Sequence, residues 1–159
     1  MLANALPTFA QTAGPIVDTT TGKVRGALLD GVHSFKGIPY GANTGGKNRW
    51  LPPQAVTPWT GVRDALDYGP RAPQNERPAK EPHLAWIRDT RAYSEDCLVL
   101  NVFTPGLGNQ GGNTRRPVLV YIHGGGFVGG SLDDADVAAG FIADVDIEGH
   151  AVTLAIERA

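Results

Sequence analysis

The clearest chemical signal in the sequence is a run of three glycines that follows an apolar stretch. Residues 117–122 are nearly all apolar, and Gly124, Gly125 and Gly126 come shortly after them, just before the bulky Phe127. Glycine has no side chain to keep a ligand away from the backbone amides. Acyl-transfer enzymes use such a loop after a strand to stabilise an oxyanion. We therefore expect the amides of Gly125 and Gly126 to form an oxyanion hole.

The same glycines could instead cradle a phosphate group. Residues 124–130 formally allow the Gly-x-Gly-x-x-Gly pattern of a dinucleotide site, which must lead directly into a helix. Phe127 and Val128 would then occupy positions where the backbone must meet the pyrophosphate, and no Lys follows as a P-loop requires. The sequence favours the oxyanion hole, and it implies no cofactor and no metal.

A catalytic nucleophile is harder to find. The 159 residues contain no Gly-x-Ser-x-Gly nucleophile elbow. His123 could act as a general base, but the sequence places no Ser or Cys beside it, so a structural role in orienting the loop is favoured. Ser34, Ser94 and Ser131 have no elbow around them, and Ser131 is better interpreted as a helix cap.

A second polar cluster lies at residues 94–97, with the sequence Ser-Glu-Asp-Cys. The side chains of Glu95 and Asp96 should point to opposite sides of an extended segment, so we do not expect an acid–base pair. Cys97 is flanked by acids, which disfavour a thiolate, and we expect it to fill a small space in the core. Because it is the only cysteine, an intrachain disulfide and a thiolate metal cluster are excluded.

The composition limits the kinds of partner. The sequence is 42% hydrophobic and 19% charged with a net charge of -2, so neither nucleic acid nor an anionic membrane is implied. The four histidines lack the spacing of a zinc site, and no run reaches the roughly 18 apolar residues of a membrane span. Residues 1–13 should be poorly ordered and make a poor secretion signal, although they could be the tail of one. A single unpaired cysteine is compatible with the cytoplasm, which we favour.

The elements that must position these groups begin with a small antiparallel sheet. Residues 16–18, 22–28 and 32–38 have the pattern of short strands, and an Asp-Gly pair at 30–31 indicates a hairpin turn. Prolines punctuate residues 39–93, which should be mostly loop, a length that usually indicates a binding or lid role. We expect the tryptophans of this region to pin loops onto the core; they are Trp50, Trp59 and Trp86.

The rest of the sequence predicts strands and a helix in alternation. Residues 98–103 form a strand, and residues 117–122 form a strand covered on both faces. An amphipathic helix at 133–145 and a buried strand at 151–156 follow, which together with residues 117–122 make a right-handed βαβ unit. The predicted fold class is therefore α/β.

Several motifs, taken in order, resemble one known family. They are Gly-Lys-Val-Arg-Gly at 22–26, Phe-Lys-Gly-Ile-Pro-Tyr at 35–40, Trp-Thr-Gly-Val-Arg-Asp-Ala at 59–65, Ala-Pro-Gln at 72–74, the segment 94–103 and His-Gly-Gly-Gly-Phe at 123–127. From about residue 14 to residue 130 the chain resembles the N-terminal part of a type-B carboxylesterase, the family of para-nitrobenzyl esterases and cholinesterases. Residues 149–158 still resemble the strand that follows the glycine loop in that family.

The resemblance implies a truncated α/β-hydrolase fold. Residues 14–159 would be an incomplete carboxylesterase domain, with a small N-terminal antiparallel sheet, a long loop region and the start of a mostly parallel central sheet. The implied activity is hydrolysis of a carboxylic ester through an acyl-serine, with Gly125 and Gly126 as oxyanion donors. Cys97 matches a cysteine that many members pair with an earlier one, and that partner is absent here.

The same resemblance leads to expectations for the isolated chain. The family's nucleophilic Ser, acid and His have no counterpart in these residues, so we expect a fragment or split enzyme that is inactive alone. The alternative is a non-catalytic, cholinesterase-like binding or interaction module. Strands at 98–103, 118–122 and 151–156 would present unpaired edges, which favours self-association.

Overall fold

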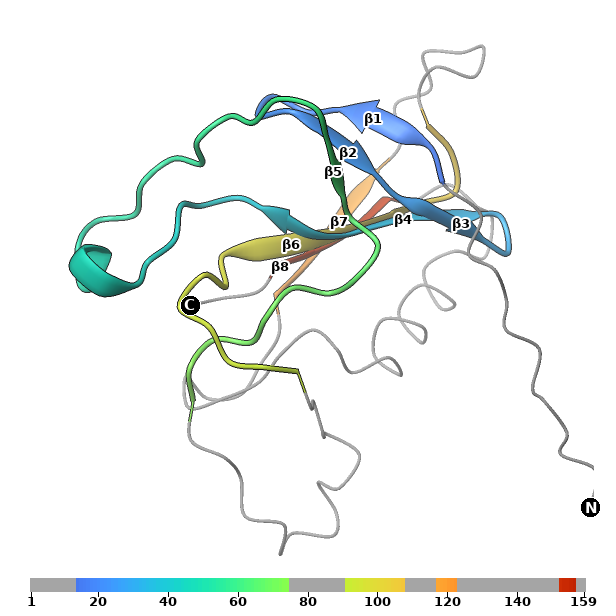
Figure 1. Cartoon of the computed structure of the whole chain (residues 1–159). Coiled ribbons are helices and arrows are strands. Elements are labelled where there is room, and N and C mark those ends of the chain that lie inside the picture. Colours follow the sequence, from blue (N-terminus) through green and yellow to red (C-terminus); the bar gives the residue numbers. More distant parts are fainter. Residues whose placement is uncertain (1–13, 75–90, 108–116, 123–151, 157–159) are drawn as a thin grey trace, which may run out of the picture.

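The computed structural model describes residues 14–74, 91–107, 117–122 and 152–156 of the chain (Figure 1). These residues form short strands arranged in two sheets, and a single turn of 3-10 helix, η1 (Gly46–Asn48). A long excursion of irregular chain joins the two sheets and carries η1 at its far end (Figure 1). Within the described part of residues 40–93, only η1 and one short strand are regular, which confirms that this region is mostly loop.

The smaller sheet contains three strands in the order β1-β2-β5. β1 (Ile16–Asp18) pairs antiparallel with β2 (Lys23–Arg25), as the sequence predicted. β5 (Val62–Asp64) pairs parallel with β2 and comes from the region expected to be loop. The predicted antiparallel pairing of β1 with β2 is therefore confirmed, but this sheet is mixed because a distant segment completes it, and the strand predicted at 32–38 lies in the larger sheet instead.

The larger sheet begins with the predicted hairpin. β3 (Ala27–Leu29) pairs antiparallel with β4 (Val32–Pro39), and the two-residue turn has positive φ at Asp30 (51°) and Gly31 (82°). Positive φ at both turn residues matches the right-handed twist of the flanking strands. The single strand expected at 22–28 is divided at Gly26, where a Cβ would lie 2.6 Å from the Phe35 ring. At this close approach the chain passes from the small sheet to the large one.

The remaining strands extend the larger sheet in the order β3-β4-β6-β8-β7. β6 (Val99–Thr104) pairs antiparallel with β4 and β8 (Val152–Ile156), and β7 (Val118–Ile122) pairs parallel with β8. The parallel pair agrees with the predicted βαβ unit, whose helix at 133–145 lies outside the described residues. β6 and β8 have a neighbour on each side, so the expectation of unpaired edges there is wrong.

β7 differs from its prediction in a second way. Within the described residues it pairs only with β8 and so forms one edge of the sheet. Its alternate side chains are exposed, namely Val118 at 59%, Val120 at 50% and Ile122 at 44%. The expected cover on both faces is therefore wrong for β7 in this structure. An apolar run alone does not tell a central strand from an edge strand, because strand order is set by distant pairing.

The hydrophobic core lies between the two sheets. Val24 on β2, Phe35 on β4 and Ala65 after β5 are almost completely buried against one another. Trp59 packs against this cluster and its Nε1 donates to the Lys23 carbonyl at 3.0 Å, so its predicted role in pinning a loop is confirmed. Trp50 is 99% exposed, and that prediction is wrong because the chain leaves the core at η1. Trp86 lies outside the described residues.

β4 contains a bulge where it pairs with the central strand β6, just after the core residue Phe35. The register shifts between Phe35 and Ile38, and Gly37 has a φ of 67°. This shift lets the amide of Gly37 point at the side chain of Asn101 on β6, where Asn101 Oδ1 accepts it at 2.9 Å. Asn101 is only 2% exposed. Its amide group thus supplies the partner that the strand ladder does not provide at the bulge.

We predict that Asn101→Ala destabilises the fold by about 1 to 3 kcal/mol, because the Gly37 amide loses its acceptor at a partly buried position. Equilibrium denaturation with urea measures the change. Asn48→Ala is the matched control, since its side chain donates to the Asn43 carbonyl at 3.0 Å in an exposed position. Equal effects of the two substitutions would contradict the proposed role of Asn101.

Candidate functional site

The glycine loop itself lies outside the described residues, as do Gly125, Gly126, His123 and Ser131. The structure does place the strand that leads to it. β7 ends at Ile122, directly before His123, and Ile122 lies opposite Ile156 in the parallel pair with β8. The carboxyl ends of both strands therefore meet at the same edge of the sheet. Ligands in α/β sheets bind beyond the carboxyl ends of the parallel strands, which agrees with the position expected for an oxyanion loop.

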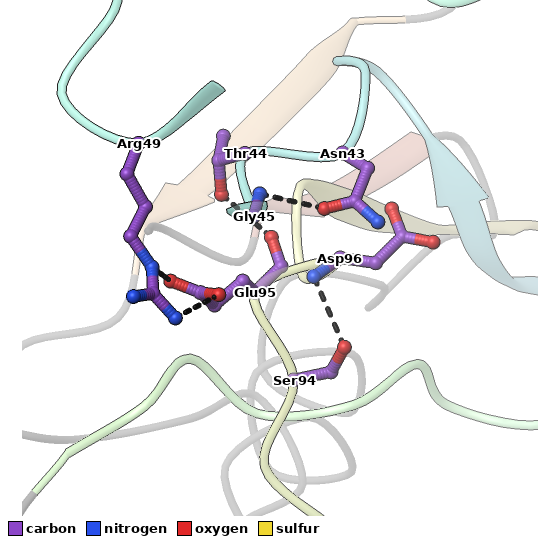
Figure 2. A network of polar contacts seen from close by, with 7 residues as sticks. All are labelled: Asn43, Thr44, Gly45, Arg49, Ser94, Glu95 and Asp96. Carbon is purple, nitrogen blue, oxygen red and sulfur yellow. Dashed lines mark hydrogen bonds and ion pairs between the residues drawn. The ribbon is translucent and has the colours of Figure 1, made fainter. Parts of the chain in front are cut away.

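A network of polar contacts joins the loop around η1 to the segment before β6 (Figure 2). Arg49 binds Glu95 with two hydrogen bonds: Nε donates to Oε1, and Nη2 donates to Oε2 at 2.7 Å. Thr44 reaches the backbone of the same residue, because its hydroxyl donates to the Glu95 carbonyl at 2.6 Å. Glu95 therefore holds the η1 loop with both its side chain and its backbone.

The ion pair changes the titration of both partners. The hydrogen bonds from Arg49 lower the pKa of Glu95 and outweigh the desolvation that raises it, and the attraction between the two charges lowers it further. The pKa of Arg49 is raised for the same reasons, chiefly by its hydrogen bonds to Glu95. The pair is bidentate, so it fixes direction as well as distance. Its main role is to position the η1 loop.

The neighbouring carboxylate takes a different direction. Asp96 points away from Arg49, as Figure 2 shows, and its backbone amide donates to Ser94 Oγ at 3.0 Å. Glu95 and Asp96 thus face opposite ways and do not form an acid–base pair, as predicted.

The other candidate side chains of the sequence have structural positions. Ser94 closes a local turn, and Ser34 lies within β4 opposite Phe103 of β6. Cys97 is 1% exposed, which confirms it as a core residue.

Asp96 instead lines an open groove of about 590 Å³. The groove runs between the end of β4, the segment after β5 and the segment before β6, and it has both basic and acidic side chains along it: Lys36, Arg63, Asp64, Asp67 and Asp96. Its volume falls in the range of small-molecule sites. Among the residues that the structure describes, no group of three or more His, Cys, Asp or Glu side chains is placed to hold a metal ion.

Sequence reasoning missed two residues that organise this part of the molecule. Arg49 gave no local signal, because its partner Glu95 lies 46 positions along the chain. Asn101 did give one, since it is a polar residue inside the otherwise apolar run at 98–103.

In the described part of the chain no helix is long and apolar enough to cross a membrane.

Comparisons with known proteins agree on one family. A family model described as the carboxylesterase family matches residues 13–147. Phenmedipham hydrolase of Pseudarthrobacter oxydans is 44% identical over 139 residues, which cover 87% of this chain and 27% of that protein. Acetylcholinesterase of Gallus gallus is 43% identical over 129 residues, covering 74% of this chain and 16% of that protein.

Solved structures give the same result for the fold. A thermophilic pNB esterase superposes with a TM-score of 0.71 at 34% identity, covering 89% of this chain and 27% of that chain. A carboxylesterase of Geobacillus stearothermophilus superposes with a TM-score of 0.68, also at 34% identity, covering 89% of this chain and 26% of that chain. The chain thus spans about a quarter of these proteins. The predicted fold class is confirmed as part of an α/β-hydrolase fold.

We predict that Glu95→Gln weakens the fold at neutral pH and that this effect becomes smaller as the pH falls below about 4.3. The folded-state pKa of Glu95 lies below its unfolded value of about 4.3, so the ion pair stabilises the fold fully above that pH. The stabilisation is lost as the pH falls through the lowered pKa. Urea denaturation of both proteins at pH 7 and pH 3 measures the difference.

The neighbouring substitution Asp96→Asn serves as the control for this experiment, because that carboxylate points away from Arg49. In Asp96→Asn the free energy of unfolding should fall between pH 7 and pH 3 by the same amount as in the wild type. A difference between the wild type and Glu95→Gln that is the same at both pH values would show that the ion pair is not its source.

Proposed function

Because the chain belongs to the carboxylesterase family, we propose that it forms the part of a carboxylic ester hydrolase that carries the oxyanion hole. The observation that supports this most is the position of the glycine run. In the sequence it begins two residues after Ile122, the last residue of β7, which lies where the carboxyl ends of the parallel strands meet. The substrate class is a carboxylic ester, and no cofactor is required.

In the proposed mechanism, a serine attacks the ester carbonyl and the carbonyl oxygen becomes negative in the tetrahedral intermediate. The backbone amides of Gly125 and Gly126 donate hydrogen bonds to this oxyanion. Each such donor is typically worth about 10² to 10³ in rate, because it is aimed in advance at charge that develops only in the transition state. His123 orients the loop rather than acting as the base.

The described residues fix the position of β7, the strand that precedes this loop in the sequence. β6 pairs with β4 on one side and with β8 on the other, so it links the core to the parallel pair β7 and β8. The Arg49–Glu95 pair holds the η1 loop against the segment that leads into β6. We propose that these contacts position the sheet edge at which the loop begins.

The nucleophile is the missing part of this mechanism. The 159 residues contain no Gly-x-Ser-x-Gly. Removal of the nucleophile from a hydrolytic triad typically costs about 10⁶ in turnover. We therefore propose that a polypeptide of these residues alone does not turn over esters.

Two assays with a short-chain nitrophenyl ester test the proposal. The chain alone should show no hydrolysis above that of a heat-denatured sample. In a chimera, residues 14–130 replace the matching segment of the Geobacillus stearothermophilus carboxylesterase, and this chimera should hydrolyse the ester in a reaction that a serine-directed inhibitor stops.

Turnover by the chain alone that the same inhibitor abolishes would contradict the proposed inactivity. A chimera that melts cooperatively but has no activity would contradict the oxyanion role. That second result would favour the alternative function, a non-catalytic binding or interaction module that uses the groove of about 590 Å³.

We also propose that two copies of the chain associate through β7. This strand carries no charged residue, and its alternate side chains at 118, 120 and 122 are exposed. An antiparallel pairing centred on Val120 places Val118 of each copy opposite Ile122 of the other, so the strand is complementary to itself. Natural edge strands usually carry a charge or a bulge that blocks such pairing.

We predict that Val120→Lys shifts the chain toward the monomer, because it places a charge at the centre of the pairing surface. Sedimentation equilibrium over a range of concentrations measures the change. Leu29→Lys is the matched control on β3, at the opposite edge of the same sheet. A wild-type chain that stays monomeric at every concentration, or a control with the same effect as Val120→Lys, would count against β7 as the interface.

A further inference from the structure

Residues 67–71 and residues 91–96, which lie on either side of residues 75–90 in the sequence, are side by side in the structure. Arg71 forms a parallel bridge with Tyr93. The amide of Arg71 donates to the carbonyl of Ala92 at 3.1 Å, and the amide of Ser94 donates to the carbonyl of Arg71 at 2.9 Å. Backbone hydrogen bonds therefore join the two segments at one point.

Two arginine side chains, one from each segment, strengthen this junction. Nε of Arg71 donates to the carbonyl of Arg91 at 2.9 Å, and Nη1 of Arg91 donates to the carbonyl of Gly69 at 2.5 Å. Each guanidinium thus reaches across to the backbone of the other segment. Hydrogen bonds from a charged donor are about twice as strong as those between neutral groups.

Aromatic rings hold both guanidinium groups in place. The guanidinium of Arg71 lies over the Tyr93 ring at 4.2 Å, and that of Arg91 lies over the Tyr68 ring at 5.4 Å. The ammonium group of Lys36 on β4 also lies over the Tyr68 ring, at 4.5 Å. Contacts of this kind are attractive because a cation meets the negative face of the ring.

The first of the two segments is anchored to the core. The amide of Ala65 donates to the Arg25 carbonyl and its carbonyl accepts the Lys36 amide, both at 2.8 Å. Gly69 lies so close to β6 that a Cβ would be 2.6 Å from Val99 Cγ2. The second segment continues into Glu95, which Arg49 holds.

Both segments also form walls of the groove. Asp67 and Gly69 line it from the first segment, and Ser94 and Asp96 line it from the second. The separation of the two segments therefore sets the width of the groove. No intrachain disulfide contributes to this separation, because Cys97 is the only cysteine in the chain.

From these contacts we propose that Arg71 and Arg91 form a non-covalent clasp that couples residues 67–71 to residues 91–96 and fixes the width of the groove. The two segments open and close together, and the two arginines act as positioning residues. This clasp does not depend on the ester hydrolase proposal, because its contacts and the groove lie entirely within the described residues.

The test is the exchange of the backbone amide protons at positions 71 and 94, followed by NMR on the whole chain. In Arg91→Ala both protons should exchange at least about tenfold faster, although the Arg91 side chain binds neither of them, because the clasp opens as a unit. Protection within β4 should change little. Arg91→Lys keeps a cation near Tyr68 but loses the fork, so it should give a smaller acceleration.

Two comparisons make the result specific. Arg63→Ala removes a guanidinium that lies over the Trp59 ring at 5.6 Å, outside the clasp, and it should leave both protons protected. The double variant Arg71→Ala/Arg91→Ala should accelerate exchange much less than the product of the two single effects, because each arginine binds the backbone of the segment that the other one holds in place.

Several results would overturn the proposal. In Arg91→Ala or Arg91→Lys, an amide at position 71 that keeps its wild-type protection would show that the segments are not coupled. Equal acceleration of amides across both sheets would show general destabilisation instead of a clasp. Multiplicative effects in the double variant would show that the two arginines act independently.

Discussion

The hydrogen bond between the buried side chain of Asn101 and the Gly37 amide is the contact on which the arrangement depends. It stabilises the bulge in β4 at the point where this strand faces the central strand β6. Next to the bulge, the amide of Lys36 donates to the Ala65 carbonyl at 2.8 Å, which joins the large sheet to the segment after β5. One buried amide group therefore connects the core, the central strand and one wall of the groove.

From β6 the structure extends in two directions. Its neighbour β8 pairs with β7, and the last residue of β7 comes shortly before the glycine run in the sequence. The segment that precedes β6 in the sequence contains Glu95, which forms a bidentate ion pair with Arg49. Exposed ion pairs contribute little to stability, so this pair matters mainly because it fixes where the η1 loop lies. The proposed clasp of Arg71 and Arg91 acts in the same way on the segments beside it.

Much of this fold could be predicted from the sequence because its signals are local. The Asp-Gly pair gave the hairpin between β3 and β4, and alternating or continuous apolar runs gave β4, β6, β7 and β8. The division of residues 22–28 at Gly26 was missed, because it arises where the chain passes close to Phe35. The positions of β5 and β7 in their sheets were missed as well, since strand order depends on pairing between distant segments.

In the candidate site, too, the features with local sequence signals were predicted and those that depend on distant residues were not. The glycine run, the directions of Glu95 and Asp96 and the buried thiol of Cys97 were all inferred from neighbouring residues. The partner of Glu95 could not be, because Arg49 lies far away in the sequence and only the folded chain brings them together. Trp50 was expected against the core, but a loop that leaves the core carries it into solvent.

The central claim is that the amides of Gly125 and Gly126 stabilise an oxyanion, and kcat for ester hydrolysis by the carboxylesterase chimera tests it most directly. Gly125→Pro removes one amide hydrogen, and we expect kcat to fall by about 10² to 10³ with little change in KM, because the bond forms only in the transition state. Gly129→Pro, a glycine of the same region without an assigned role, should reduce kcat much less. A Gly125→Pro chimera with unchanged kcat, or equal losses from both substitutions, would contradict the account.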